Sequence, residues 1–224
     1  MKKLIVFIHG LNGSEKSWMN KEGKKFGDLL LLNPIIQEGY DIEYYDYKEE
    51  ASVFSKLGIE KNGKILKTWL TAKTKKYEEV VLICHSMGGL LAKYIILNEK
   101  IREKIKLYIS LAVPHKGSNL GNLGIFEKVK NLAPYSEVLN ELEKDWIKKY
   151  KILPKTIYLT GENDSVVTDI SSRALEAGER EEDVEEYSTA DGHISISKPE
   201  DNNSLVYLLI ESKLEDFLER DENE

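Results

Sequence analysis

The sequence has very little cysteine: Cys84 is the only one among 224 residues. A single cysteine cannot form an intramolecular disulfide, so the folded state has to be stabilised by a hydrophobic core. Disulfide frameworks are typical of oxidising compartments, and a chain without one suits a reducing compartment. We therefore expect a cytoplasmic protein.

Long hydrophobic runs are also lacking. No stretch approaches the roughly 18 consecutive apolar residues that a transmembrane helix needs, so we expect no stable membrane insertion. The opening MKKLIVFI resembles the start of a signal peptide, but its apolar run ends after residue 8, at His9-Gly10. A signal peptide needs an apolar region of about seven to fifteen residues. Residues 4–8 are instead predicted to form a buried first strand.

The sequence also lacks an excess of basic residues. Lysine and arginine number 32 against 39 aspartates and glutamates, which gives a formal net charge of −7. Nucleic-acid binding depends on clustered positive charge, so we expect no nucleic-acid partner. The same balance disfavours docking on anionic membranes. With 41% hydrophobic residues, the chain has the composition of a globular protein, predicted here as a single domain over residues 1–224.

Short apolar runs alternate with helical patterns along most of the chain, which is typical of parallel βαβ units. Strands are predicted at residues 4–8, 42–47, 80–84, 105–113, 156–160 and 184–187. Apolar residues recur at helical spacing in residues 65–73, 87–97 and 204–218. The pattern predicts an α/β fold with a mostly parallel sheet of about six strands and helices on both faces. Residues 219–224 are predicted to form a frayed acidic tail.

Two long stretches interrupt this alternation, at residues 16–39 and 115–150. The second contains an amphipathic helical pattern over residues 135–150. Long insertions in a compact α/β domain are commonly lids or binding loops. We interpret residues 115–150 as a small lid-like insertion, and the alternative is a helix that packs flat on the core.

The strand predicted at residues 80–84 runs directly into His85-Ser86-Met87-Gly88-Gly89 and then into a helix. A serine at a sharp strand-to-helix turn forms a nucleophile elbow, in which a strained backbone exposes the hydroxyl group. The usual pattern is G-x-S-x-G, and here Cys84 replaces the first glycine. We predict that Ser86 is a nucleophile; the alternative is a serine that merely caps the helix.

A serine nucleophile needs a base and an orienting acid, which in folds with this elbow follow in the order Ser, Asp/Glu, His. Of the four histidines, only His193 follows the last predicted strand. The acid should come from the loop after residues 156–160, where Asp164 is the natural choice and Glu162 and Asp169 are alternatives.

The loop after the first strand, HGLNG, allows two interpretations. It can supply the Leu11 N–H to an oxyanion hole, together with the Met87 N–H that follows the nucleophile. It also comes close to the phosphate-binding pattern G-x-x-x-x-G-K-[ST], with Lys16-Ser17 at its end. That pattern needs a glycine where Glu15 stands, and a carboxylate there repels phosphate. We favour the oxyanion hole and interpret Lys16 and Ser17 as ordinary loop residues.

Together these motifs resemble those of the α/β-hydrolase superfamily. Within it, the chain is similar to the lipase-like serine esterases that include the GPI inositol-deacylase and serine-active-site-containing lipase groups. The resemblance is carried by the stretches FIHGLNG, ICHSMGGLLAKY, LAVPHKGS, GENDSVV and GHISISKP. Residues 4–217 take part in it. Because the three residues before Leu4 leave no room for the N-terminal antiparallel strands of the superfamily, we expect a sheet trimmed to about six strands.

The resemblance implies a role for each matching residue. Ser86, Asp164 and His193 match the catalytic triad, and the backbone N–H groups of Leu11 and Met87 match the oxyanion hole. The candidates for the border of the substrate pocket are Gly10, His85 and His115. For His115, a structural turn residue is an equally good interpretation.

The predicted function is a serine hydrolase that cleaves carboxylic esters, with a small-molecule or lipid ester as substrate. The chemistry requires no metal and no organic cofactor. An acyltransferase that uses the same triad and a non-catalytic binding module with this fold remain as alternatives, and the oligomeric state is not predicted.

Overall fold

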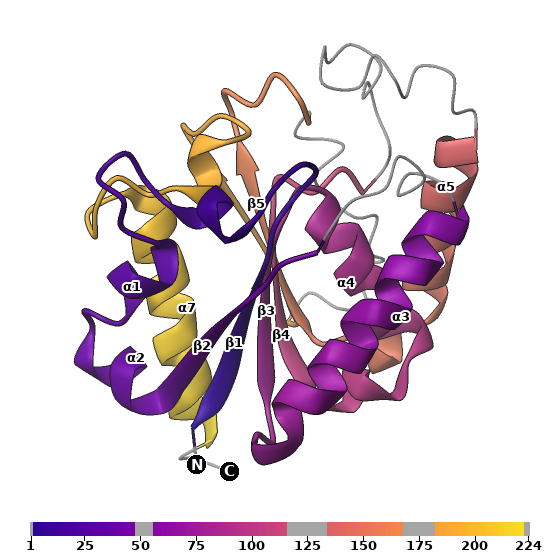
Figure 1. Ribbon diagram of the computed structural model, residues 1–224, viewed down its shortest axis with the longest axis horizontal. Helices are drawn as coiled ribbons and strands as arrows, with labels where there is room; N and C mark the ends of the chain where they lie inside the picture. The colour runs from indigo at the N-terminus through magenta and orange to yellow at the C-terminus, as the bar shows by residue number, and fades with distance from the viewer. Residues whose placement is uncertain (1, 48–55, 116–133, 168–181, 222–224) are drawn as a thin grey trace.

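The computed structural model describes residues 2–47, 56–115, 134–167 and 182–221, and is built around one parallel sheet (Figure 1). The sheet has six strands in the order β2-β1-β3-β4-β5-β6. The strands are β1 (Lys3–Ile8), β2 (Tyr40–Tyr45), β3 (Val80–His85), β4 (Ile105–Leu111), β5 (Lys155–Gly161) and β6 (Val184–Thr189). Every pairing between neighbouring strands is parallel, which confirms the predicted sheet.

Helices cover both faces of the sheet, as predicted (Figure 1). One face carries α1 (Phe26–Leu30), α2 (Pro34–Gly39) and α7 (Leu205–Asp221), and the other carries α3 (Lys56–Lys73), α4 (Met87–Asn98) and α5 (Pro134–Lys148). Short 3-10 helices are η1 (Glu15–Trp18), η3 (Thr74–Lys76), η4 (Lys100–Lys104), η7 (Tyr150–Ile152) and η9 (Ser195–Ser197). No helix in the described ranges is both long and apolar enough to span a membrane.

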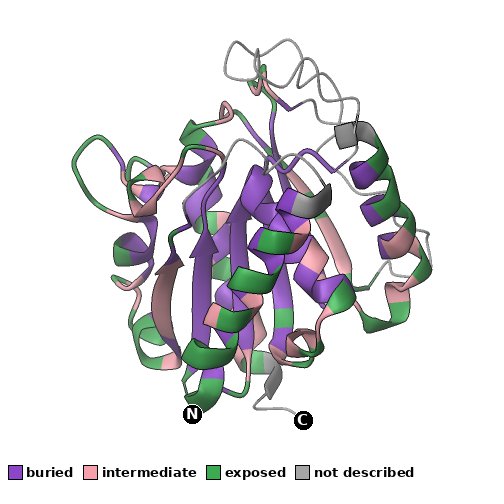
Figure 2. Cartoon of the chain, turned by 45° about the vertical axis from the view of Figure 1, so that its right-hand side comes forward, coloured by how far each residue is buried: buried purple, intermediate pink, exposed green. Residues whose placement is uncertain are grey.

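The core lies on both sides of the sheet, and β1 shows why. Leu4, Val6 and Ile8 belong to the apolar cluster under α3, α4 and α5, whereas Ile5 and Phe7 belong to the cluster under α1, α2 and α7. A strand that is buried on both faces reads as a continuous apolar run, because neither side meets water. Figure 2 shows these central strands as buried and the outward sides of the helices as exposed.

The order of the strands reverses between β1 and β3, which forms a topological switch point in the sheet. β1 lies between β2 and β3, so the chain leaves β1 toward one side of the sheet and returns to its other side. In open parallel sheets, ligands bind at such a switch point, outside the carboxyl ends of the strands. Ile8 pairs with Cys84, so the loop that follows β1 and the Ser86 turn that follows β3 start close together.

Several predicted boundaries differ from the structure, most clearly at β2, β4 and the end of the chain. β2 begins at Tyr40 rather than residue 42, because Tyr40 and Asp41 already pair with β1. β4 ends at Leu111 rather than residue 113, because Ala112 adopts a positive φ of 48° and leaves the strand. The acidic tail is only partly a tail: α7 continues to Asp221, and residues 222–224 lie outside the described residues.

The described parts of the two long insertions are helical. In residues 16–39, α2 begins where Asn33 caps the first N–H groups and Pro34 occupies the first turn. In residues 115–150, α5 packs on the core with Trp146 fully buried, as in the second of the two interpretations of this segment. Residues 116–133 lie outside the described residues, so a lid there stays a prediction.

Candidate active site

Ser86 lies at the turn between β3 and α4 in a strained backbone conformation. Its φ of 51° and ψ of −126° fall in a region that non-glycine residues rarely adopt. Such strain persists only when surrounding contacts hold it, and it is common at functional sites. The Ser86 side chain makes no capping hydrogen bond to α4, so the interpretation as a simple helix cap is wrong.

Close packing of α4 against the end of β1 holds this turn in place. A Cβ atom added at Gly88 would lie 2.4 Å from the carbonyl oxygens of both Ile8 and His9, so only glycine fits there. On the other side, the Ser86 N–H donates to the Leu111 carbonyl at 3.0 Å. The first turn of α4 is therefore fixed between β1 and β4.

His193 lies between Ser86 and Asp164 in a chain of hydrogen bonds. Its Nε2 atom is 3.1 Å from Ser86 Oγ, and its Nδ1 atom is 2.8 Å from Asp164 Oδ2. An ionised carboxylate can only accept, so the Nδ1 atom carries the ring proton. The Nε2 atom is then free to accept a hydrogen bond from the Ser86 hydroxyl.

Asp164 is held rigidly in the loop after β5. Its side chain is 1% exposed, and its Oδ1 atom accepts hydrogen bonds from the N–H groups of Val166 and Val167 at 2.7 and 2.8 Å. The other oxygen therefore remains for His193. Of the two alternative acids, Glu162 is exposed on the same loop, and Asp169 lies outside the described residues.

His85 supports the His193 loop from the protein interior. Its Nε2–H donates to the His193 carbonyl oxygen at 2.7 Å, and the two rings are 4.9 Å apart. Burial, assisted by the nearby His193, lowers the pKa of His85 to about 3. His85 is therefore neutral at neutral pH and fixes the backbone of its neighbour without placing a charge in the site.

The loop after β1 is shaped by the buried ring of His9. Its Nδ1–H donates to the Gly10 carbonyl at 2.7 Å, and its Nε2 atom accepts from the Tyr47 N–H at 3.2 Å. Burial lowers the pKa of His9 although the exposed Asp46 carboxylate lies 3.2 Å from Nε2, so the neutral ring dominates at neutral pH. Gly13 N–H also donates to the Gly10 carbonyl, at 3.2 Å.

These two bonds determine the direction of the next N–H group. In a trans peptide the carbonyl and the N–H point in opposite directions, so holding the Gly10 oxygen in place also orients the Leu11 N–H. Within the part of the chain that the structure describes, neither the Leu11 N–H nor the Met87 N–H has a hydrogen-bond acceptor. Both are thus available to a ligand beside Ser86.

A cavity of about 160 Å³ lies next to Ser86. It is lined by Gly10, Leu11, Asn12, Gly13, Ser17, His85, Ser86, Val166, His193, Ile194, Ser197 and Lys198. Gly10 and His85, two of the predicted pocket residues, are among them. His115 is not: it is buried, its Nε2 atom lies 2.9 Å from Ser110 Oγ, and its ring meets the Tyr158 ring edge-to-face. These contacts are those of a structural turn residue.

Several lining residues were not predicted from the sequence. From the sequence, Ser17 is interpreted as an ordinary loop residue. In the structure, its carbonyl accepts a hydrogen bond from Ser197 Oγ at 3.1 Å, and this bond joins two walls of the cavity. Ile194 and Lys198 follow His193 directly in the chain. In the sequence, only their position close after the expected base, His193, indicates that they could line the site.

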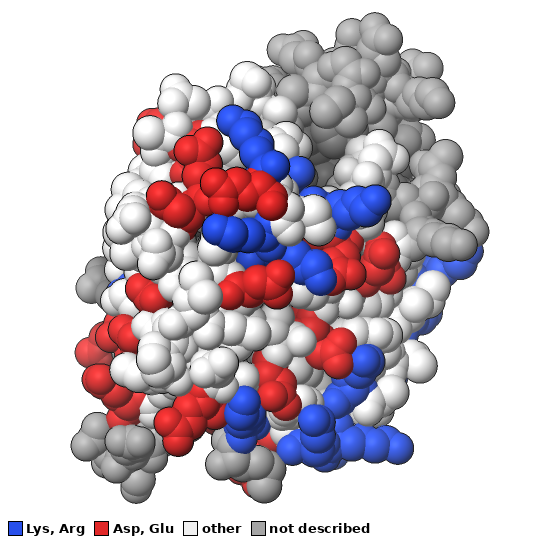
Figure 3. Space-filling model, turned by 60° about the vertical axis from the view of Figure 1, so that its left-hand side comes forward, with Lys and Arg blue, Asp and Glu red and all other residues white. Residues whose placement is uncertain are grey.

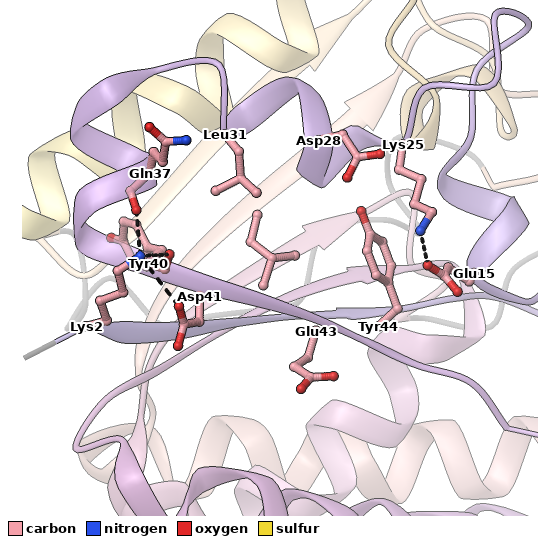
Figure 4. A pocket seen from close by; sticks show the side chains of 11 residues that line it. Lys2, Glu15, Lys25, Asp28, Leu31, Gln37, Tyr40, Asp41, Glu43 and Tyr44 are labelled. Atoms are coloured by element: carbon pink, nitrogen blue, oxygen red, sulfur yellow. Dashed lines mark hydrogen bonds and ion pairs between the residues drawn. The ribbon is translucent and has the colours of Figure 1, made fainter.

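A larger cavity of about 480 Å³ lies beside the edge strand β2 and shares no lining residue with the first (Figure 4). Four of its charged groups form ion pairs with one another: Lys2 pairs with Asp41 at 3.6 Å, and Lys25 pairs with Glu15. Glu15 is thus engaged with Lys25 and takes no part in the loop after β1. Basic and acidic side chains are likewise interleaved over the face shown in Figure 3.

The fold is shared with known hydrolases. The structure matches the esterase Pf2001 of Pyrococcus furiosus with a TM-score of 0.59 and 16% identity, over 98% of this chain and 83% of that one. It matches the mature lipase BlEst2 of Bacillus licheniformis with a TM-score of 0.64 and 19% identity, over 88% and 86% of the two chains. An α/β hydrolase, MGS-MChE2, from the metagenome of lagoon sediments of Mar Chica, Morocco, gives 0.59 and 17%, over 99% and 93%. These likenesses confirm the α/β-hydrolase fold.

Sequence comparison then places the chain in a family. No curated protein sequence gives a significant match. The model of the PGAP1-like alpha/beta domain matches residues 2–176, which include the loop after β1, the Ser86 turn and Asp164. The match spans more than half of the chain and agrees with the resemblance to lipase-like esterases. The chain therefore belongs to the family of the PGAP1-like alpha/beta domain.

Proposed function

We propose that this protein is a serine hydrolase that cleaves carboxylic esters, with Ser86 as nucleophile. The observation that carries the proposal is the chain of hydrogen bonds from Ser86 Oγ through His193 to Asp164, beside a cavity. A serine hydroxyl is a weak nucleophile alone, and an adjacent base oriented by an acid is what activates it. A binding module does not require this arrangement.

In the acylation step, Ser86 Oγ attacks the carbonyl carbon of the ester while its proton passes to His193 Nε2. The Asp164 carboxylate keeps the ring in the productive tautomer and stabilises the imidazolium that forms. The N–H groups of Leu11 and Met87 donate to the oxyanion of the tetrahedral intermediate. His193 then delivers its proton to the alkoxide as the C–O bond breaks, which releases the alcohol and leaves Ser86 acylated.

In the deacylation step, a water molecule gives a proton to His193 Nε2 and attacks the acyl carbon. The second tetrahedral intermediate uses the same two N–H donors. It collapses when the proton returns to Ser86 Oγ, and the carboxylic acid leaves. The enzyme ends with the protonation states with which it began.

The shape around Ser86 supports an ester substrate with an apolar portion. A groove of about 860 Å³ adjoins the cavity, and Ile194 and Lys198 line both. Ile194 and Leu205 on its walls are each 53% exposed, which leaves apolar surface for a bound chain. The similarity to an esterase and a lipase agrees with small-molecule or lipid esters as the substrate class.

The proposal is tested by hydrolysis of p-nitrophenyl esters of increasing acyl length by the wild type and Ser86→Ala. We expect Ser86→Ala to lose turnover by up to about 10⁶-fold, because the three residues act as a unit. A fluorophosphonate probe should label the wild type through a Ser86 Oγ–phosphorus bond with loss of fluoride. Ser188→Ala, at an exposed serine of β6, should retain both activity and label. A Ser86→Ala variant within tenfold of the wild type would refute the proposal.

A further inference from the structure

The wall of the Ser86 cavity carries a single formal charge. Of the residues that line it, Lys198 is the only lysine or arginine, and none is an aspartate or a glutamate. The Asp164 carboxylate is buried behind His193 and faces its Nδ1 atom. Inside this cavity, a bound substrate would therefore meet one ammonium group and no carboxylate among the lining residues.

The Lys198 ammonium has no ion-pair partner among the residues that the structure describes. The two acidic residues that line the adjoining groove are Asp191 and Glu200, and Glu200 pairs with Lys21 at 3.6 Å. Lys198 is also only partly exposed, so solvent screens its charge less than that of a surface lysine.

The backbone around Lys198 is held in place on both sides. Its N–H donates to the Ser195 carbonyl at 2.8 Å, and it stands between the buried residues Ser197 and Pro199. The Asn20 side-chain amide donates to the carbonyls of Pro199 and Glu200 at 3.2 and 2.9 Å. The lysine side chain therefore projects from a fixed wall and lines both the cavity and the groove.

We propose that Lys198 is a specificity-determining residue that selects esters carrying a negatively charged group, a carboxylate or a phosphate, near the scissile bond. The inference rests on the proposed ester hydrolysis and names its substrate class. A lysine ammonium is a compact point charge with three donors, which suits an anion of either kind. Charge-assisted hydrogen bonds are roughly twice as strong as neutral ones, so a partly buried cation discriminates between charged and neutral substrates.

Two pairs of esters test this, and the members of each pair differ in charge and by one methyl group. For the acyl side, 4-nitrophenyl hydrogen glutarate is compared with its methyl ester. For the alcohol side, 4-acetoxybenzoate is compared with methyl 4-acetoxybenzoate. The readout is the ratio of kcat/KM for the anionic to that for the neutral member, after subtraction of the uncatalysed rate.

In at least one pair, we expect Lys198→Gln to lower this ratio by about tenfold and Lys198→Glu to lower it further, because like charges repel. The affected pair identifies the side of the ester that carries the anion. The wild-type ratio should also fall as salt is added, since ions screen the attraction. Lys24→Gln, which removes an exposed lysine paired with Glu22, is the matched control and should leave the ratio unchanged.

The outcomes separate this inference from the proposed function. If the wild type cleaves no ester, or if Ser86→Ala cleaves them equally well, the proposed function fails. If cleavage depends on Ser86 but Lys198→Gln leaves both ratios unchanged, the role of Lys198 is overturned and ester hydrolysis stands. A Lys24→Gln variant that lowers the ratio as much as Lys198→Gln would assign the effect to overall charge and also overturn the inference.

Discussion

Gly10 and Ser86 lie against each other at the carboxyl ends of β1 and β3. A Cβ atom at Gly10 would be 2.8 Å from Ser86 Cβ and 3.3 Å from His85 Nδ1. The Ser86 Cβ atom is attached to the backbone, and the His85 ring is held by its hydrogen bond to the His193 carbonyl, so Gly10→Ala should displace the loop that presents the Leu11 N–H. Loss of one oxyanion donor costs about 10²–10³ in kcat. We expect a loss of that size in steady-state hydrolysis, with KM much less affected.

Gly192→Ala is the control for this prediction, because it adds the same methyl group beside His193. The nearest atom to a Cβ at Gly192 is the Asn163 carbonyl oxygen at 3.5 Å, an ordinary contact distance. This variant should keep kcat within a few-fold of the wild type. Equal kcat values for the two variants would show that the Leu11 N–H has no role in catalysis.

At the scale of elements, α4 and α5 are joined by a buried ion pair. Lys93 Nζ lies 2.5 Å from Glu143 Oε2, and it also stands 4.9 Å from the centre of the Trp146 ring. Removing one partner of a buried pair typically costs about 3–5 kcal/mol, because the other charge loses its counter-charge. Glu143→Ala should therefore lower the free energy of unfolding by that amount, as measured by urea denaturation.

Glu141→Ala provides the comparison on the exposed side of the same helix. Exposed ionic interactions contribute about 0–1 kcal/mol, so its effect should stay below that limit. A Glu143→Ala variant no less stable than Glu141→Ala would mean that the Lys93–Glu143 pair does not hold α5 on α4.

For the whole molecule, two buried neutral histidines predict how stability depends on pH. Burial lowers the pKa of His9, and it lowers that of His85 from 6.5 to about 3. Below pH 6.5 the unfolded chain binds protons that these residues do not bind in the folded state. The free energy of unfolding is thus highest above this pH and falls as the pH drops, by up to about 1.4 kcal/mol per pH unit for each histidine.

Urea denaturation at several pH values between about 7.5 and 4.5 measures this slope. His85→Gln should reduce it by up to about 1.4 kcal/mol per pH unit, since glutamine does not titrate. An unchanged slope in His85→Gln would contradict the buried, neutral state of the ring. The comparison of slopes remains valid even if the variant is less stable at every pH.

The sequence by itself determined the order of strands and helices and the candidate residues of the site. Short apolar runs that alternate with helical patterns predict the six strands, because a buried strand shows itself as a local run of apolar residues. Ser86, Asp164 and His193 are predicted from motifs at the ends of strands. The exact ends of the strands did not follow from the sequence, because the backbone conformations of Tyr40 and Ala112 depend on partners elsewhere in the chain.

Only the tertiary structure decided which side chains surround Ser86. The wall that holds Lys198 is fastened by Ser197 Oγ to the Ser17 carbonyl, a contact between residues 180 positions apart. The ring of His9 holds the Gly10 carbonyl only because Tyr47, from beyond the neighbouring strand, donates to its other nitrogen. Likewise, α5 packs on α4 through contacts between distant residues, among them the Lys93–Glu143 ion pair and the buried Trp146. Such contacts form between distant segments, and no local pattern encodes them.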